Sequence, residues 1–230
     1  MKKTKSNVKN ISFLQVVLTV LFVSTLLISN VITSKQVQLP FDIVMTGAVF
    51  VFPITYILSD LFSEVYGYKW SRLTCYLAFA MNLFMVIVFA LVIQSPAPDF
   101  WTNQEAFATV LGSTPRVLIA SLAAFIIGDF VNDKVFKVFK EKHPNDHKGF
   151  GFRAILSSFC GELVDSLIFL PLAFLGQMPL ASLVVMTITQ VIIKTGYEII
   201  ILPVTRLIVK KVSKYEKNIH NDGGDLKPAA

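Results

Sequence analysis

Six long apolar stretches make up most of this 230-residue sequence. A bilayer core about 30 Å thick is crossed by a helix of roughly 20 mostly apolar residues, and each stretch has about that length. We therefore predict an all-α integral membrane protein with six transmembrane helices and no separate soluble domain. The predicted spans are 11–34, 41–62, 70–94, 115–131, 153–176 and 182–209.

The composition excludes several classes of protein. Hydrophobic residues are 54% of the chain, charged residues only 16%, and the mean hydropathy is +0.64. Soluble domains average about 25% charged residues, so an ordinary soluble enzyme, a coiled coil and a disordered protein are all excluded. Cys75 and Cys160 lie in apolar runs, and we predict neither a disulfide framework nor a metal cluster.

The placement of the basic residues predicts the orientation of the chain. With the N-terminus in the cytoplasm, 18 of the 21 Lys and Arg residues fall in cytoplasmic segments; Lys35 and Arg116 fall outside, and Lys194 lies within a span. Cytoplasmic loops of membrane proteins carry such an excess. We therefore predict that both termini are cytoplasmic and that the net charge of +6 reflects topology rather than direct binding of nucleic acid.

The spans are predicted to form one transmembrane domain over 11–211. A basic cytoplasmic N-terminus at 1–10 precedes it, and a disordered cytoplasmic tail at 212–230 follows it. A capping box in the long outer segment favours a short interfacial helix at 102–111. Three spans precede this segment and three follow it, which permits a 3+3 inverted repeat of the kind found in transporters.

The fifth predicted span holds the densest set of polar residues. Ser158, Glu162 and Asp165 share one helical face with Phe169, because residues three or four apart are neighbours on a helix. Asp165 lies roughly 18 Å from the start of its span, near the midplane. Charged groups at that depth usually face a bundle interior or a water-filled path. We predict a binding site here; the alternative is that these residues only join neighbouring helices.

The sixth predicted span supplies a cation at a similar depth, counted from the opposite face. Lys194 is predicted to lie level with Asp165, and Gln190 and Tyr197 are predicted to line the same side of this helix. Two interpretations remain open. Lys194 belongs to a binding site, or it only neutralises a nearby carboxylate such as Glu198, four residues on.

Polar residues in the first two spans are further candidates. Pro53 is expected to kink the second span, which also carries Tyr56 and Asp60. Asn30 lies near the outer end of the first span, where it either faces the same cavity or bonds a neighbouring helix. Motifs for nucleotide binding, zinc proteolysis and serine hydrolysis are absent from the sequence, so we predict no enzyme activity and no cofactor.

Several short motifs, taken in order, resemble those of the queuosine-precursor transporter family, also called the vitamin uptake transporter family. These motifs are Ser29-Asn30, Phe52-Pro53, Ser59-Asp60-Leu61, Tyr66-Gly67, Asp165-Ser166 with Phe169, and Lys194. The resemblance covers about residues 11–211. It implies a bacterial inner-membrane importer of 7-cyano-7-deazaguanine, 7-aminomethyl-7-deazaguanine or queuine, bases used in transfer-RNA modification. Glu162 departs from the family pattern, which is not reliably acidic at that position.

The chemistry of such a base suits the candidate residues. A guanine-like base presents a ring N–H and an exocyclic amine side by side, which a carboxylate of Asp165 or Glu162 could accept together. Lys194 or Gln190 could donate to the base carbonyl. An aromatic ring could stack on its flat face. The candidate rings are Phe52, Tyr56, Phe169 and Tyr197.

Other functions remain as alternatives. The chain could be the substrate-binding subunit of a vitamin uptake system that needs a separate energising module. A membrane enzyme that holds Mg²⁺ between carboxylates is the third hypothesis. The expected partners are a small 7-deazapurine base and the lipid bilayer, and the sequence leaves a homodimer open.

Overall fold

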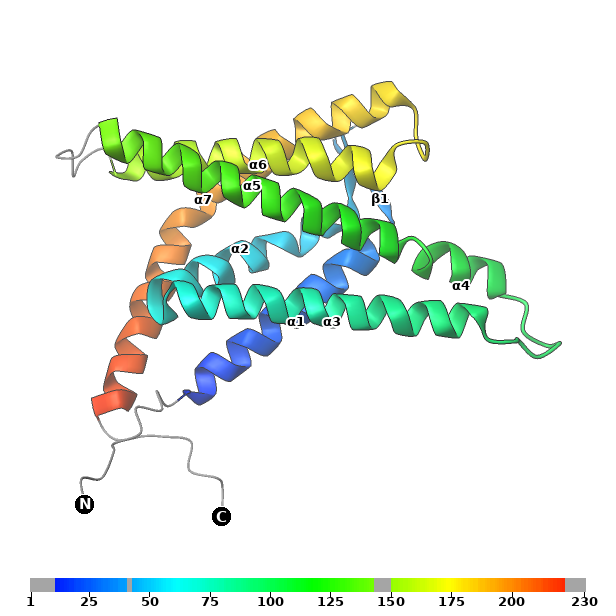
Figure 1. Cartoon of the computed structure of the whole chain (residues 1–230), viewed down its shortest axis with the longest axis horizontal. Helices are drawn as coiled ribbons and strands as arrows, with labels where there is room; N and C mark the ends of the chain where they lie inside the picture. Colours follow the sequence, from blue (N-terminus) through cyan, green and yellow to red (C-terminus); the bar gives the residue numbers. More distant parts are fainter. Residues whose placement is uncertain (1–10, 41–42, 143–149, 222–230) are drawn as a thin grey trace, which may run out of the picture.

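Long helices account for most of the computed structural model, which describes residues 11–40, 43–142 and 150–221 (Figure 1). The elements in chain order are α1 (Phe13–Ile32), β1 (Gln36–Leu39), β2 (Ile43–Thr46), η2 (Gly47–Phe50), α2 (Phe52–Leu61), η3 (Phe62–Tyr66), α3 (Tyr68–Gln94), α4 (Gln104–Leu111), α5 (Thr114–Lys142), α6 (Phe150–Phe174) and α7 (Leu180–Asn221).

The outward side chains of the helices are those of a membrane protein. Among the described residues, four helical stretches are long and apolar enough to cross a bilayer: Phe13–Ile32, Tyr68–Gln94, Gln104–Gly128 and Leu180–Asn218. Large apolar side chains point outward from them; Phe13 and Ile119 are each 68% exposed and Ile200 is 74% exposed. Soluble proteins rarely expose so much apolar surface, whereas lipid solvates it favourably. At 25 residues, α6 also has the length of a span.

The prediction of one continuous helix over 41–62 is wrong. The described part of this segment begins as strand β2, which pairs antiparallel with β1, Gln36 opposite Thr46. After η2, helix α2 starts at Phe52 with Pro53 in its first turn, where the missing proline N–H costs nothing. Hydropathy cannot distinguish a short buried strand from part of a helix. The strand that hydrogen-bonds to β2 is β1, which lies outside the predicted span and so could not be inferred from it.

Two further boundaries differ from the sequence analysis. Helix α7 continues to Asn221, so residues 212–221 are helical rather than a disordered tail. Helix α5 continues to Lys142, past the predicted end of the fourth span at 131. Hydropathy marks only the apolar part of a helix, whereas the helix itself runs on into a polar segment. The rest of the predicted tail and the N-terminal 1–10 lie outside the described residues.

The helices pack in two groups joined by α7. Helices α5 and α6 lie side by side along their length, and α1 contacts both α2 and α3 (Figure 1). Helix α7 contacts both α6 and α2, and it changes direction part-way along its length (Figure 1). Pro203 lies inside α7, and a proline within a helix removes a backbone hydrogen bond and favours such a bend. The contact between α6 and α7 brings the fifth and sixth predicted spans together.

Candidate functional site

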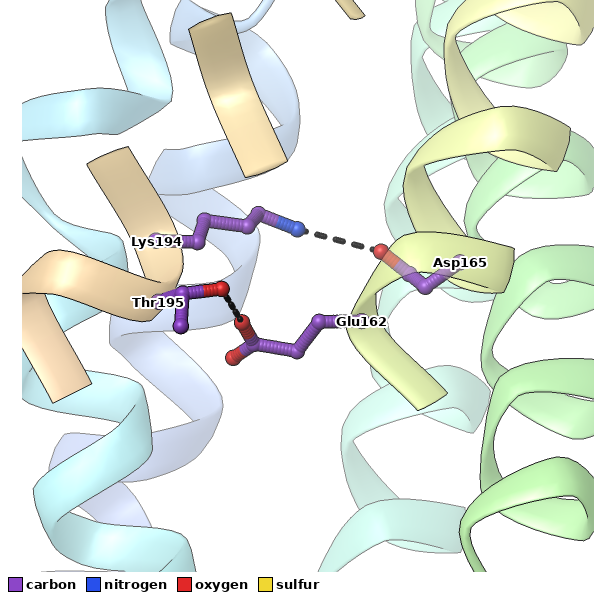
Figure 2. Close-up of polar contacts among 4 residues, drawn as sticks. All are labelled: Glu162, Asp165, Lys194 and Thr195. Atoms are coloured by element: carbon purple, nitrogen blue, oxygen red, sulfur yellow. Dashed lines mark hydrogen bonds and ion pairs between the residues drawn. The ribbon is translucent and has the colours of Figure 1, made fainter. Parts of the chain in front are cut away.

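An ion pair joins α6 to α7. Lys194 Nζ donates a hydrogen bond to Asp165 Oδ2 at 3.1 Å, as Figure 2 shows. The side chains of Lys194 and Asp165 are only 10% and 30% exposed, respectively. The two residues predicted to lie at one depth thus meet. Removing one partner of such a pair leaves an uncompensated charge, which costs about 3–5 kcal/mol for a buried pair.

Glu162 lies one turn before Asp165 on the same side of α6, and both point toward α7 (Figure 2). Its Oε2 accepts from the Thr195 hydroxyl at 3.5 Å, a long hydrogen bond. Two carboxylates and one ammonium group therefore converge between the helices.

Two buried polar atoms on α6 and α7 have no hydrogen-bond partner among the described residues. They are Ser166 Oγ and Gln190 Oε1. Ser166 is fully buried and Gln190 is 5% exposed. Each is close in sequence to a member of the ion pair, Ser166 next to Asp165 and Gln190 one turn before Lys194. Buried polar atoms normally have a partner, so both are open to one supplied by a bound molecule.

Helix α5 sets the position of Asp165 from behind. A Cβ added at Gly128 would lie 2.9 Å from the Gly161 carbonyl oxygen and 3.2 Å from Asp165 Cβ. Only a residue without a side chain allows the two backbones to approach this closely. The spacing between α5 and α6 at the level of the ion pair thus depends on Gly128.

Asn30 bonds a neighbouring helix. Its amide nitrogen donates to Asn82 Oδ1 on α3, and both residues are buried, 9% and 2% exposed. Asn82 also donates to the Ala78 carbonyl one turn earlier. Of the two roles left open for Asn30, the observed contact is the helix-to-helix one.

The structure places the remaining candidates as follows. Phe169 packs beside a buried apolar cluster and makes an edge contact with Phe174, with ring centroids 6.4 Å apart. Tyr197 is partly buried on α7, and Asp60 is exposed on α2. No contact of the described residues joins Asp60 to the ion pair. The side chains of Tyr56 and Ser158 lie outside the described residues.

Four residues of this region were missing from the predicted site. They are Thr195, Ser166, Asn82 and Gly128. In the sequence, the hydroxyls of Thr195 and Ser166 and the amide of Asn82 are weak indications of a site, because polar residues inside apolar spans are uncommon. A glycine opposite another helix carries none, because its role depends on what approaches it. Within the described residues, no three His, Cys, Asp or Glu side chains gather where they could hold a metal ion.

Comparison with known proteins identifies the family. Residues 46–208, well over half of the chain, match the profile of the family described as "Putative vitamin uptake transporter". The chain belongs to this family. The matched region contains α6, the ion pair and Lys194's neighbours on α7, whereas Asn30 lies before it.

A curated relative adds to this assignment. The chain is 28% identical over 148 residues to the "Probable queuosine precursor transporter" of Bacillus subtilis (strain 168). The match covers 64% of this chain, and the chain spans 64% of the relative's length. No solved structure matches the chain significantly. A member of this family with so many apolar helices is a multi-pass membrane protein.

Proposed function

We propose that this chain imports a 7-deazapurine base, a precursor of queuosine, and binds it between α6 and α7. The observation that carries the proposal is the ion pair between Asp165 and Lys194; the unpartnered atoms Ser166 Oγ and Gln190 Oε1 lie on the same two helices. The family match and the printed name of the Bacillus relative support a substrate of this class. The candidates are 7-cyano-7-deazaguanine, 7-aminomethyl-7-deazaguanine and queuine.

On binding, the base would replace the hydrogen bond between Lys194 and Asp165 with hydrogen bonds of its own to both residues. Its ring N–H and exocyclic amine would donate to Asp165, while Lys194 donates to its carbonyl. Gln190 Oε1 is available as an acceptor for a further N–H of the ligand. A base that lacks one of these groups would leave a buried partner unpaired, which is a strong source of specificity. Glu162, Phe169 and Tyr197 are the adjacent candidates.

The proposed topology keeps six crossings, with both termini in the cytoplasm of a bacterium and the chain in its inner membrane. In this arrangement α2 and η3 form a short second crossing, extended by the β1–β2 hairpin. Transporters build such broken segments where the irregular backbone is covered by protein or lines a cavity. The distribution of basic residues supports this orientation.

The site is tested by neutralising the pair singly and together. Asp165→Asn and Lys194→Gln should each abolish binding of 7-cyano-7-deazaguanine to the purified protein and its uptake in cells. The double variant should fold at least as well as either single variant, because it leaves no lone buried charge. It should nevertheless fail to bind, since the groups that recognise the base are gone.

The matched controls are Asp99→Asn and Lys134→Gln, which neutralise two exposed groups outside the pair. Guanine serves as the control ligand. If the double neutral variant binds and transports normally, the pair serves only mutual neutralisation and the assignment of the site is wrong. Uptake into liposomes that contain the purified chain alone would exclude the alternative of a subunit that needs an energising module.

A further inference from the structure

A buried carboxylate joins three distant parts of the chain at one end of the bundle. Glu216 Oε1, near the end of α7, accepts from the Ser12 hydroxyl at 2.6 Å and from the Tyr66 hydroxyl at 2.8 Å. Glu216 is 7% exposed and Ser12 is 6% exposed. Ser12 lies 204 positions and Tyr66 lies 150 positions before Glu216 in the chain. One oxygen atom therefore holds the start of α1, the end of η3 and the end of α7 together.

The three groups are chemically matched to this arrangement. Ser12 is also the N-cap of α1, where its oxygen accepts from the Gln15 N–H at 3.0 Å, so its hydroxyl hydrogen is available for Glu216. A phenol hydroxyl keeps its proton at neutral pH, so the Tyr66 hydroxyl is a donor to Glu216. Two hydrogen bonds of this kind can break and form again, so the contact is compatible with reversible opening.

Aromatic rings close the space directly inside this contact. The Tyr66 ring lies 6.1 Å from that of Phe62, which makes an edge contact with Phe22 on α1 at 5.6 Å between centroids. Phe22 and Phe62 are 4% and 1% exposed, and Leu58 packs with them. The start of α1 and the end of η3 are thus held to α7 by a polar contact, with an apolar layer from α1, α2 and η3 behind it.

The opposite end of α1 is open. A cavity of about 500 Å³ is bordered there by Val31 and Lys35, together with Phe50 of η2 and Thr109 of α4. The 20 residues of α1 separate this cavity from Ser12 by about 30 Å. Along α1 the structure is therefore closed at one end and hollowed at the other, an asymmetry of the kind that one state of an alternating-access transporter has.

We propose that Ser12, Tyr66 and Glu216 form a latch that closes the cytoplasmic mouth of the transporter and must open for substrate release. Ser12 and Glu216 both lie outside the family match at 46–208, so the latch is a feature of this chain beyond that match. The basic residues around the end of α7 (Lys210, Lys211, Lys214 and Lys217) are the reason for assigning this end to the cytoplasm.

The first test measures opening without any substrate. In a chain with Cys75 and Cys160 replaced by Ala, the buried Leu58 is replaced by Cys as a reporter. Tyr66→Phe, which keeps the ring and removes the hydroxyl, should increase the labelling rate of this thiol several-fold. The reagent is membrane-impermeant and is applied to the cytoplasmic face of inverted vesicles. Glu216→Gln should act in the same direction. The matched control is Tyr68→Phe, a change at a tyrosine that is 66% exposed.

Equal labelling rates in Tyr66→Phe and Tyr68→Phe would overturn the latch. Because this readout needs no ligand, it is independent of the proposed substrate. A wild-type protein that binds none of the three bases, while Tyr66→Phe still labels faster, would refute the proposed function and leave the latch standing.

A second test distinguishes a gate from a static brace. Ser12→Cys and Glu216→Cys are combined in the same cysteine-free chain and joined by a short cleavable thiol crosslinker. The crosslinked protein should retain binding of 7-cyano-7-deazaguanine but lose its uptake into liposomes, and cleavage of the crosslinker should restore uptake. Undiminished uptake by the crosslinked protein would show that the contact does not need to open.

Discussion

Asp165 is positioned by a neighbour that has no side chain. Gly128 allows α5 to approach the backbone of α6 at Gly161, directly behind the carboxylate. A methyl group at this position would meet a backbone carbonyl, which cannot rotate away as a side chain would. The geometry of the ion pair therefore depends on a residue that contributes no atom to it.

Gly128→Ala is accordingly expected to push α6 away from α5 and to weaken ligand binding through Asp165. Overpacking of this kind costs about 1–3 kcal/mol of stability. Thermal unfolding in detergent and the affinity for 7-cyano-7-deazaguanine provide the two measurements. Gly196→Ala on α7 is the matched control, because beyond the adjacent residues and backbone of its own helix no described atom lies within 4 Å of the added Cβ. Wild-type stability and affinity in Gly128→Ala would contradict the positioning role.

At the scale of elements, the contact between α1 and α3 depends on a polar pair. Asn30 donates to the Asn82 carbonyl oxygen within apolar helices, where lipid offers no hydrogen bonds. Asn30→Leu should destabilise the protein by about 1–3 kcal/mol, because the Asn82 amide is left without this partner. The double change to Leu should recover part of that loss, since neither amide remains. Thermal unfolding of the two single variants and the double variant gives the coupling energy.

The same variants test the role of Asn30 in binding. If Asn30→Leu retains the full stability of the wild type but loses ligand affinity, its interpretation as a helix-to-helix contact is wrong. Loss of stability with unchanged affinity in the folded fraction would support that interpretation.

At the scale of the whole molecule, the orientation in the membrane is the main prediction. In a chain without native cysteines, Lys35→Cys should react with an impermeant thiol reagent added outside the cell. Tyr215→Cys should react only after the cytoplasmic face is exposed. Both positions are exposed in the structure, so the difference in labelling reports the side of the membrane. Reversed labelling would contradict the proposed topology and move the latch to the outer face. The 3+3 inverted repeat stays a prediction.

Much of the element map could be predicted from hydropathy. The apolar stretches of α1, α3 and α7 are long enough to identify without tertiary information. The prediction of a single helix over 41–62 is wrong because a short apolar run has the same hydropathy whether it forms a strand or a helix. Its first part is a strand because it pairs with β1. The helical end of α7 was missed because its sequence is polar and the group that anchors Glu216 lies at the other end of the chain.

The sequence by itself determined that this chain belongs in a membrane, and it singled out Asp165 and Lys194 as charges at one depth. Burying an ionisable group in lipid is so costly that its presence in an apolar span is informative without a structure. Only the tertiary structure decided that these two side chains meet, that Asn30 bonds Asn82, and that Ser12, Tyr66 and Glu216 converge. Those contacts depend on which helices pack against each other and through which faces. Hydropathy does not indicate which helix will pack against a given face.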